Sequence, residues 1–235
     1  MSSRSQAENY IGLGKVLTSR DGRDWQVAKK SGEFVDDNIL AKVEIEEQFV
    51  SRAALKLKSV AEKLNVDFRE KVVLDIGSST GGFTQFAITR GAKKVIAVDV
   101  GTNQLHPKLR HSEFAKKIEL HEKTDIRDFS TTERIDIVLT DVSFISLREI
   151  LPHVAKNLAN PQTEIVAMVK PQFEAGHSRK NHGVIKNETE RREILRNFEA
   201  FAKRYFVILA KKDSEIAGTK GNRERFYLLK LLLKH

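Results

Sequence analysis

Residues 72–83 read Val72-Val73-Leu74-Asp75-Ile76-Gly77-Ser78-Ser79-Thr80-Gly81-Gly82-Phe83, an apolar run that ends in an acid and a glycine-rich turn. The apolar run predicts a buried strand, and residues 84–90 predict a short helix that stops at Gly91. The three glycines let the backbone turn sharply and approach a ligand closely. Their spacing, G-x-x-x-G-G, differs from both the dinucleotide fingerprint and the P-loop. The stretch therefore predicts a strand, a turn and a helix N-terminus that suits a small, partly anionic ligand.

Strand-like and helix-like patterns alternate from Lys71 to the end of the chain. The strand-like patterns cover residues 72–76, 95–100, 118–121, 135–141, 165–170, 205–210 and 226–233, and the helical patterns cover 83–90, 146–158 and 188–203. Such alternation predicts an α/β fold, with a parallel sheet that carries helices on both faces. No helical pattern separates the last two strands, so we expect them to form an antiparallel pair at one edge.

Composition narrows the classes of function. The chain has 235 residues and a formal net charge of +9, which favours a polyanionic partner, nucleic acid before a membrane surface. A basic protein without such a partner would fit the charge as well. The absence of cysteine excludes disulfides and cysteine-ligated zinc and favours a reducing, cytoplasmic compartment, and the scattered histidines predict no metal site. The polar start predicts no signal peptide, and no apolar run approaches the ~20 residues of a membrane helix.

Four acids stand at or just after the ends of expected strands, namely Asp75, Asp99, Asp125 and Asp141. In an open α/β sheet the ligand binds outside the carboxyl ends of the strands, and an acid about 20 residues past the glycine turn is placed to bind ribose hydroxyls. Asp99 suits that role, and Asp125 suits the exocyclic amine of an adenine. One such acid alone would more often cap a helix. Four of them around a glycine turn favour a nucleoside ligand.

Several motifs together resemble a known family. They are Asp75-Ile76-Gly77-Ser78-Ser79-Thr80-Gly81-Gly82-Phe83-Thr84, Val98-Asp99-Val100-Gly101, Asp141-Val142-Ser143-Phe144-Ile145-Ser146, Val169-Lys170-Pro171-Gln172-Phe173-Glu174 and Gly218-Thr219-Lys220-Gly221-Asn222. These motifs resemble the TlyA (hemolysin A) family of FtsJ-like, S-adenosylmethionine-dependent RNA methyltransferases. The resemblance implies a seven-stranded Rossmann-like (class I) methyltransferase sheet, S-adenosylmethionine as cofactor, and ribosomal RNA or ribosomal subunits as the partner. It also implies a cytidine ribose as the methyl acceptor.

The resemblance also implies which residues bind the cofactor. They are Asp75, Gly77, Ser78, Thr80, Gly81, Gly82, Phe83, Asp99, Val100, Asp125, Ile126 and Asp141. On this interpretation the glycine turn holds the methionine end of the cofactor, and Asp75 and Gly77 form its floor. The residues from Asp141 to Phe144 depart from the Asn/Asp-Pro-Pro-Tyr/Phe motif of amino methyltransferases, which by analogy favours an oxygen as acceptor.

Four further positions resemble the family's Lys-Asp-Lys-Glu tetrad for 2′-O-methylation. They are Lys56, Asp141, Lys170 and Glu224. A ribose hydroxyl is a poor acid, so its methylation needs a positioned base or a local positive field. On this interpretation Lys170 takes or orients the hydroxyl proton, Asp141 and Glu224 position Lys170, and Lys56 adds positive field. Alone, a lysine at a strand end is more often simply solvated. The full set in the family order favours catalysis.

The N-terminal part of the chain has a different sequence pattern from the rest. Residues 1–47 combine one helical pattern at 6–13 with short strand-like runs, glycines and clustered basic residues, and an amphipathic helix follows over 50–64. The stretch from Ala7 to Leu17 resembles the second half of an S4 RNA-binding domain, without its leading basic helix. We therefore expect a partial S4-like α+β module at 1–47 and a methyltransferase domain at 48–235.

Other functions remain open from the sequence. A non-catalytic RNA-binding or ribosome-assembly factor could keep the same fold, although the complete tetrad argues against it. A membrane-active hemolysin, as the family name suggests, is disfavoured because no transmembrane or extended amphipathic segment is seen. A nicotinamide dehydrogenase would need a different glycine spacing. The sequence determines neither the oligomeric state nor the modified nucleotide.

Overall fold

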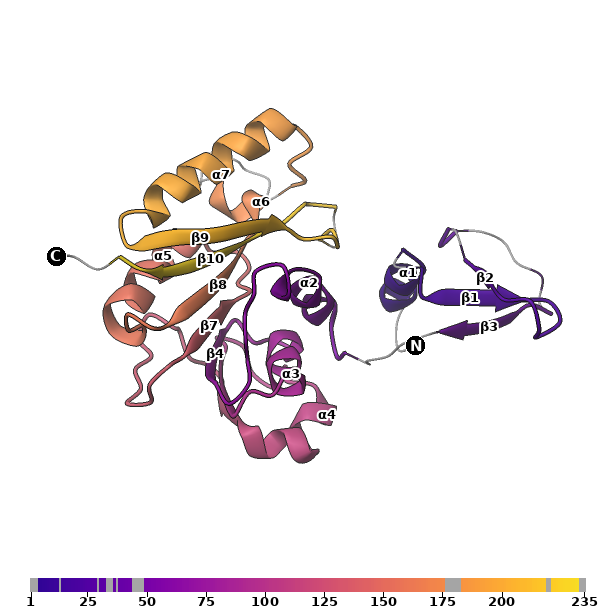
Figure 1. Ribbon diagram of the computed structural model, residues 1–235, viewed down its shortest axis with the longest axis horizontal. Helices are drawn as coiled ribbons and strands as arrows, with labels where there is room; N and C mark the ends of the chain where they lie inside the picture. The colour runs from indigo at the N-terminus through magenta and orange to yellow at the C-terminus, as the bar shows by residue number, and fades with distance from the viewer. Residues whose placement is uncertain are drawn as a thin grey trace. The chain divides into compact units, whose positions relative to one another are not determined.

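The computed structural model describes residues 4–12, 14–28, 30–32, 36, 38–43, 49–175, 183–218 and 221–232. The chain separates into two compact units, Met1–Arg52 and Ala53–His235. The expected boundary between residues 47 and 48 lies outside the described residues. Figure 1 labels elements of both units.

The first unit contains one helix and a small antiparallel sheet. Its elements are α1 (Arg4–Gly12), β1 (Val16–Ser19), β2 (Gln26–Val27) and β3 (Leu40–Val43). β1 lies between the other two strands. The side chains of Tyr10 and Val16 are buried, whereas both residues of β2 are exposed. The helix expected at 6–13 therefore corresponds to α1, and the expected short strands correspond to β1 and β3.

The second unit is built on a seven-stranded sheet. Its strands are β4 (Val72–Ile76), β5 (Lys94–Val98), β6 (Ile118–His121), β7 (Ile137–Thr140), β8 (Glu164–Val169), β9 (Phe206–Asp213) and β10 (Arg225–Leu231). They lie in the order β6-β5-β4-β7-β8-β10-β9. The first five strands in this order pair in parallel, and β10 is antiparallel to both β8 and β9. The sequence prediction of a seven-stranded sheet with an antiparallel edge pair is confirmed.

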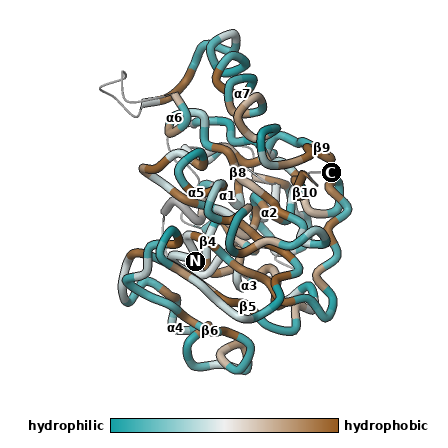
Figure 2. Tube along the Cα trace, turned by 90° about the vertical axis from the view of Figure 1, so that its left-hand side faces the viewer, coloured by the Kyte–Doolittle hydropathy of each residue, from teal (hydrophilic) through white to brown (hydrophobic). Residues whose placement is uncertain are grey.

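Helices cover both faces of the sheet. The helices are α2 (Arg52–Ala61), α3 (Gly82–Thr89), α4 (Pro107–Arg110), α5 (Leu147–His153), α6 (Pro171–Glu174) and α7 (Glu188–Ala202). Figure 1 shows α5, α6 and α7 on one side of the strands and α2, α3 and α4 on the other. Because both faces are covered, the central strands are almost fully buried. All four residues of β7 are buried, as are four of the five residues of β4 and four of the five residues of β5. Figure 2 shows hydrophobic colour along these central strands, while α7 alternates hydrophilic and hydrophobic turns.

Some element boundaries differ from the sequence prediction. The helix expected at 146–158 ends at His153 and continues as a π-helical turn over Val154–Leu158. Pro152 lies inside this helix and has no amide proton to donate, which disturbs the regular hydrogen bonding. β9 runs three residues beyond the expected end at 210, and the β9–β10 pairing contains a bulge at Leu228/Leu229. The short helices α4 and α6, and a 3₁₀ turn at Glu113–Lys117, were not predicted.

Two features are absent from the residues that the structure describes. Within these ranges, no helix is long and apolar enough to cross a bilayer. Among the same residues, no group of three or more His, Asp or Glu side chains is arranged to hold a metal ion.

Candidate cofactor and catalytic site

The strand order reverses at β4, which lies between β5 and β7. Ligands of open α/β sheets bind at such a switch point, outside the carboxyl ends of the strands. Here a hydrogen bond connects the ends of β4 and β7, since the Asp141 amide donates to the Ile76 carbonyl at 3.0 Å. The glycine turn after β4 and the acid after β7 therefore meet at one place.

The turn after β4 requires glycine at two positions. Gly77 has φ = 80°, and a Cβ atom there would lie 2.8 Å from the carbonyl oxygen of Asp141. Gly81 has φ = 89°, and a side chain there would overlap Leu105 and Leu109. Both backbone conformations disfavour other residues. The glycines thus allow the turn to lie directly against the end of β7 and against Leu105 and Leu109.

Asp75 is fully buried beneath this turn. Its Oδ2 accepts a hydrogen bond from the Thr84 hydroxyl at 2.6 Å, while Oδ1 has no hydrogen-bond partner among the described residues. Burial raises the pKa of the Asp75 carboxyl to about 7, opposed by the hydrogen bonds from Thr84 and aided by the nearby carboxylates of Asp141 and Asp99. A cation or a hydrogen-bond donor at Oδ1 would relieve the cost of ionising this group.

Asp99 follows β5 and connects it to the glycine turn. Its Oδ2 accepts a hydrogen bond from the Ser79 amide at 2.8 Å, and its Oδ1 accepts one from the Gly101 amide at 2.7 Å. The next residue, Val100, is 69% exposed although it is apolar. A fixed carboxylate beside an uncovered apolar side chain can bind a group that has both hydroxyls and a flat apolar face.

The other expected cofactor residues occupy different environments. Asp125 is engaged by Arg127, whose backbone and side-chain hydrogen bonds hold the pKa of Asp125 below its ordinary value. The side chains of Ile126 and Phe83 are buried in the protein interior. Thr80 is exposed, and its carbonyl accepts a hydrogen bond from the backbone of the α4 cap. Ser78 and Gly82 are buried in the turn, and the Ser78 hydroxyl lacks a hydrogen-bond partner in the described structure.

Lys170 and Asp141 form the first of two ion pairs in the expected tetrad. The Lys170 Nζ lies 2.7 Å from Asp141 Oδ1 and donates a hydrogen bond to the Ser143 hydroxyl, also at 2.7 Å. The side chains of Lys170 and Asp141 are only 12% and 16% exposed. Asp141 follows β7 and Lys170 follows the neighbouring strand β8, so the parallel pairing of these strands brings both residues to the same end of the sheet.

Lys56 and Glu224 form the second ion pair. Lys56 Nζ on α2 lies 2.8 Å from Glu224 Oε1, and both residues are buried. Glu224 Oε2 has no hydrogen-bond partner within the described ranges. We expected Glu224 to position Lys170, but Glu224 contacts Lys56 instead. The burial of Lys56 accompanies this pairing.

The sheet register relates the two pairs. Arg225 pairs with Val169 across the antiparallel β10–β8 ladder, so Glu224 and Lys170 are the adjacent residues just beyond the paired positions. The structure therefore brings all four expected residues to the end of the sheet where the glycine turn lies. It arranges them as two cation–carboxylate pairs.

Glu174 was missed by the sequence reasoning. It lies on α6, is buried, and accepts hydrogen bonds from the Ser146 hydroxyl at 2.6 Å and the Leu147 amide at 2.8 Å. Burial raises the pKa of Glu174, although these two hydrogen bonds oppose the shift. Glu174 thereby joins the segment after Lys170 to the segment after Asp141. Its position within the Lys170 motif was the only sequence signal.

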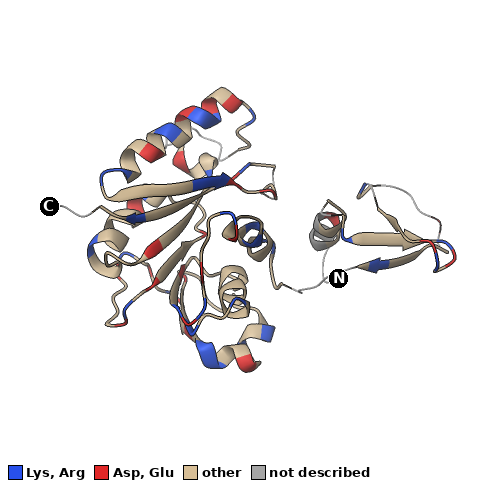
Figure 3. Cartoon of the chain, viewed as in Figure 1, with Lys and Arg blue, Asp and Glu red and all other residues tan. Residues whose placement is uncertain are grey.

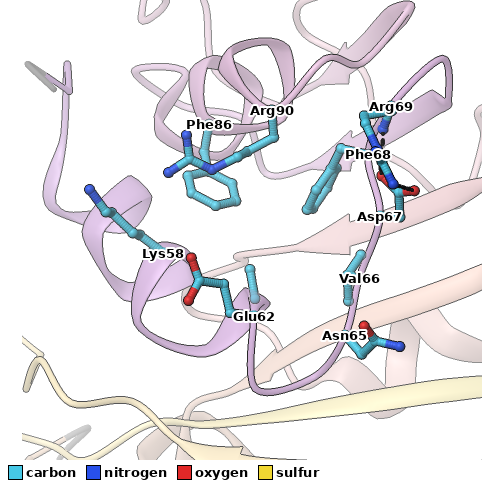
Figure 4. Close-up of a pocket in the computed structure, with 10 residues that line it drawn as sticks. Lys58, Glu62, Asn65, Val66, Asp67, Phe68, Arg69, Phe86 and Arg90 are labelled. Atoms are coloured by element: carbon cyan, nitrogen blue, oxygen red, sulfur yellow. Dashed lines mark hydrogen bonds and ion pairs between the residues drawn. The ribbon is translucent and has the colours of Figure 1, made fainter.

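A pocket of about 430 Å³ lies elsewhere in this unit, between α2, residues 64–69 and α3. Figure 4 shows Phe68 and Phe86 at this pocket with Arg90, whose guanidinium lies 5.0 Å from the centre of the Phe86 ring. Lys58 and Glu62 line the α2 side. No residue of the tetrad or of the glycine turn lines this pocket, so we assign the chemistry to the ends of the strands.

Comparison with known proteins identifies the family. The sequence profile of the FtsJ-like methyltransferases matches residues 49–231. The chain belongs to this family. The FtsJ-like chain is 44% identical to the 23S rRNA (cytidine-2′-O)-methyltransferase TlyA of Campylobacter jejuni, over 78% of this chain and 71% of that protein. It is 35% identical to the 16S/23S rRNA (cytidine-2′-O)-methyltransferase TlyA of Mycobacterium tuberculosis, over 97% of this chain and 84% of the relative.

Two other comparisons agree with this assignment. Hemolysin A of Brachyspira hyodysenteriae is 37% identical, over 94% of this chain and 91% of that protein. The solved structure of a candidate hemolysin from Streptococcus thermophilus is 34% identical and superimposes with a TM-score of 0.73, covering 98% of this chain and 84% of that one. The expected TlyA and FtsJ-like relationship is confirmed, as is the Rossmann-like methyltransferase fold.

The methyl donor that the family implies is S-adenosylmethionine, and the residues of this FtsJ-like chain fit it. This cofactor carries a cationic sulfonium and an ammonium group, and the unpartnered, buried Oδ1 of Asp75 can accept a hydrogen bond from a cationic donor. The Asp99 carboxylate and exposed Val100 match the hydroxyls and flat ring of its adenosine part.

Proposed function

We propose that this chain transfers a methyl group from S-adenosylmethionine to the 2′-hydroxyl of a cytidine ribose in ribosomal RNA. The observation that carries the proposal is the Lys170–Asp141 ion pair, which lies at the switch point beside the glycine turn. The two TlyA relatives carry that activity in their names, and they align with most of this chain. We further propose that it acts in the cytoplasm, on ribosomal subunits or their RNA.

Asp75, Gly77 and Asp99 would hold the cofactor, together with the backbone of the turn. When bound, the cofactor supplies an electrophilic methyl group. The residues of this chain would hold the acceptor oxygen in line with that group. They would also stabilise the negative charge that grows on the oxygen as its proton passes to solvent. We assign the placement of the oxygen to Lys170.

Lys170 is the cationic partner of Asp141 and is also held by the Ser143 hydroxyl. Its ammonium group can donate a hydrogen bond to the ribose oxygen, so we expect it to orient the hydroxyl and stabilise the developing alkoxide. Lys56 adds a second positive charge whose position is set by Glu224. Since both lysines are largely buried, water screens their charges little, and each charge is offset mainly by its own carboxylate partner.

We also propose that residues 1–47 form a partial S4-like module that binds RNA. The helix α1 and the three-stranded sheet of the first unit support this proposal, as do the exposed basic side chains of Lys15, Arg20 and Arg23. A methyltransferase domain at 48–235 is supported by the family match at 49–231.

The proposal is tested by titrating the purified chain with S-adenosylmethionine and measuring methyl transfer to ribosomal subunits and to protein-free ribosomal RNA. We expect cofactor binding, incorporation of labelled methyl groups, and a single 2′-O-methylated cytidine on mapping. Cofactor binding without transfer to either substrate would favour a non-catalytic RNA-binding factor. No cofactor binding would refute the proposed function.

A further inference from the structure

A groove of about 510 Å³ lies between α7 and the strands β9 and β10. The residues that line it, which define the α7–β9 groove, are Thr189, Arg192, Leu195, Arg196, Glu199, Lys211 and Arg225. Four of these side chains are cationic and one is acidic. The groove shares no residue with the tetrad, although Arg225 directly follows Glu224 in the chain.

The cations of the groove are only partly neutralised. Lys211 pairs with Glu199 at 2.8 Å, and Arg225 pairs with Asp213, which also binds Arg191. Among the described acids, Arg192 contacts Glu188 at 3.4 Å, and its side chain is 72% exposed. Arg196 is exposed and forms no ion pair with another described residue. The groove therefore keeps a surplus of positive charge on accessible arginines, which bind phosphate groups well.

One lining residue of the groove, Arg225, lies at the same end of the sheet as the tetrad. Arg225 pairs with Val169, the residue before Lys170. Thr189 and Arg192 lie in the first turns of α7, which begins after the segment that follows Lys170. Figure 3 shows the charged bands of α7 beside the basic end of β9. A nucleic acid strand with one ribose at Lys170 can thus continue onto this surface.

We propose that the α7–β9 groove binds the phosphate backbone of the RNA next to the nucleotide that is methylated. The proposal rests on the proposed function, because it takes the ribose at Lys170 as the fixed point. Arg192 and Arg196 stand four residues apart, on one face of α7, and both can reach one strand of phosphates. The contacts are to the backbone, so they add affinity and orientation without reading the base sequence.

The test compares two double variants that lose the same charge. Arg192→Gln with Arg196→Gln removes the accessible groove cations, and Lys156→Gln with Lys203→Gln removes two exposed lysines outside the groove. Binding to protein-free ribosomal RNA and to intact ribosomal subunits is measured at several salt concentrations without turnover, and S-adenosylmethionine binding is measured separately. We expect the groove variant to bind RNA about fivefold to tenfold more weakly, with a salt slope shallower by about 1.4. Its cofactor affinity should be unchanged.

Three outcomes would refute the proposal that the groove binds RNA. Equal RNA affinity and equal salt slope in the groove variant and the wild type would do so, and so would an equal loss in the control variant. Weaker binding to intact subunits with unchanged binding to protein-free RNA would assign the groove to a ribosomal protein. The readout needs no methyl transfer, so the two proposals can fail separately. A wild-type chain that binds RNA but fails to methylate it would refute the proposed function, and weaker RNA binding by the groove variant would still support RNA binding by the groove.

Discussion

The ammonium group of Lys56 lies 2.8 Å from Oε1 of Glu224, a residue 168 positions away in the sequence, and both side chains are buried. Removing one member of a buried ion pair leaves the other charge without compensation. We therefore expect Lys56→Met to lower the free energy of unfolding by about 3 kcal/mol, measured by urea denaturation.

A second variant separates stability from activity at this pair. Lys56→Met combined with Glu224→Gln leaves no buried charge, so most of the lost stability should return, whereas methyl transfer should stay low in both variants. Full activity in the double variant would contradict a catalytic role for this pair.

The Lys170–Asp141 pair allows a sharper test of catalysis. Lys170→Ala should reduce kcat by about 10³-fold, because the acceptor hydroxyl loses the group that orients it. The affinity for S-adenosylmethionine, measured by calorimetry, should change little, since the cofactor is assigned to the glycine turn. Lys170→Arg should also be impaired, because the planar guanidinium cannot occupy the site of an ammonium that contacts both Asp141 and Ser143. Substantial turnover in Lys170→Ala would refute the assignment.

The raised pKa of the Asp75 carboxyl predicts that the free energy of unfolding depends on pH. Its pKa is raised to about 7 in the folded chain, whereas an unfolded aspartate has a value of about 3.9. Between these two values the folded state binds a proton that the unfolded state has lost, so stability should fall as pH rises from about 4 to about 7. The loss is on the order of 4 kcal/mol. Asp75→Asn should remove this part of the slope in urea denaturation series.

The raised pKa of Asp75 also predicts how the affinity for the cofactor depends on pH. A cationic ligand beside Asp75 favours its ionised form, so the Kd for S-adenosylmethionine should fall about tenfold between about pH 6 and about pH 8. Binding in this range should release protons, which calorimetry in buffers of different ionisation enthalpy detects. A Kd that is the same across this range in the wild type would show that Asp75 does not face the cationic part of the cofactor.

Glu174 should position the catalytic segments. Glu174→Ala leaves the Leu147 amide and the Ser146 hydroxyl without their acceptor in a buried place, which costs about 2 kcal/mol of stability. We expect kcat to fall while the cofactor Kd stays within about twofold, because the variant loosens the segments that carry Lys170 and Asp141. Glu149→Ala, at an exposed position of α5, is the matched control and should change neither quantity. If kcat were unchanged in stable Glu174→Ala protein, its role would be only structural.

Substitution of Gly77 tests the close contact between the glycine turn and the end of β7. Gly77→Ala combines a positive φ with a Cβ atom 2.8 Å from the Asp141 carbonyl oxygen, so we expect loss of cofactor binding and of about 2 kcal/mol or more of stability. Gly91→Ala is the control. It also has a positive φ, but the nearest atom belongs to the flexible Arg69 side chain at 3.3 Å. Similar cofactor affinity in the two variants would indicate that backbone strain, and not the contact with Asp141, explains the effect of Gly77→Ala.

The sequence by itself determined the strands, their parallel arrangement and the end of the sheet that carries the site. Those features depend on local patterns, such as the apolar run before Gly77 and the acids at the strand ends. Such patterns can be recognised from neighbouring residues alone, without knowledge of tertiary contacts. The tertiary structure alone decided which charges meet. Lys56 pairs with Glu224 and not with a neighbour in sequence, because the fold brings this residue of α2 to the residue just before β10. The contacts of Glu174 with Ser146 and Leu147 likewise join segments that only the folded sheet brings together.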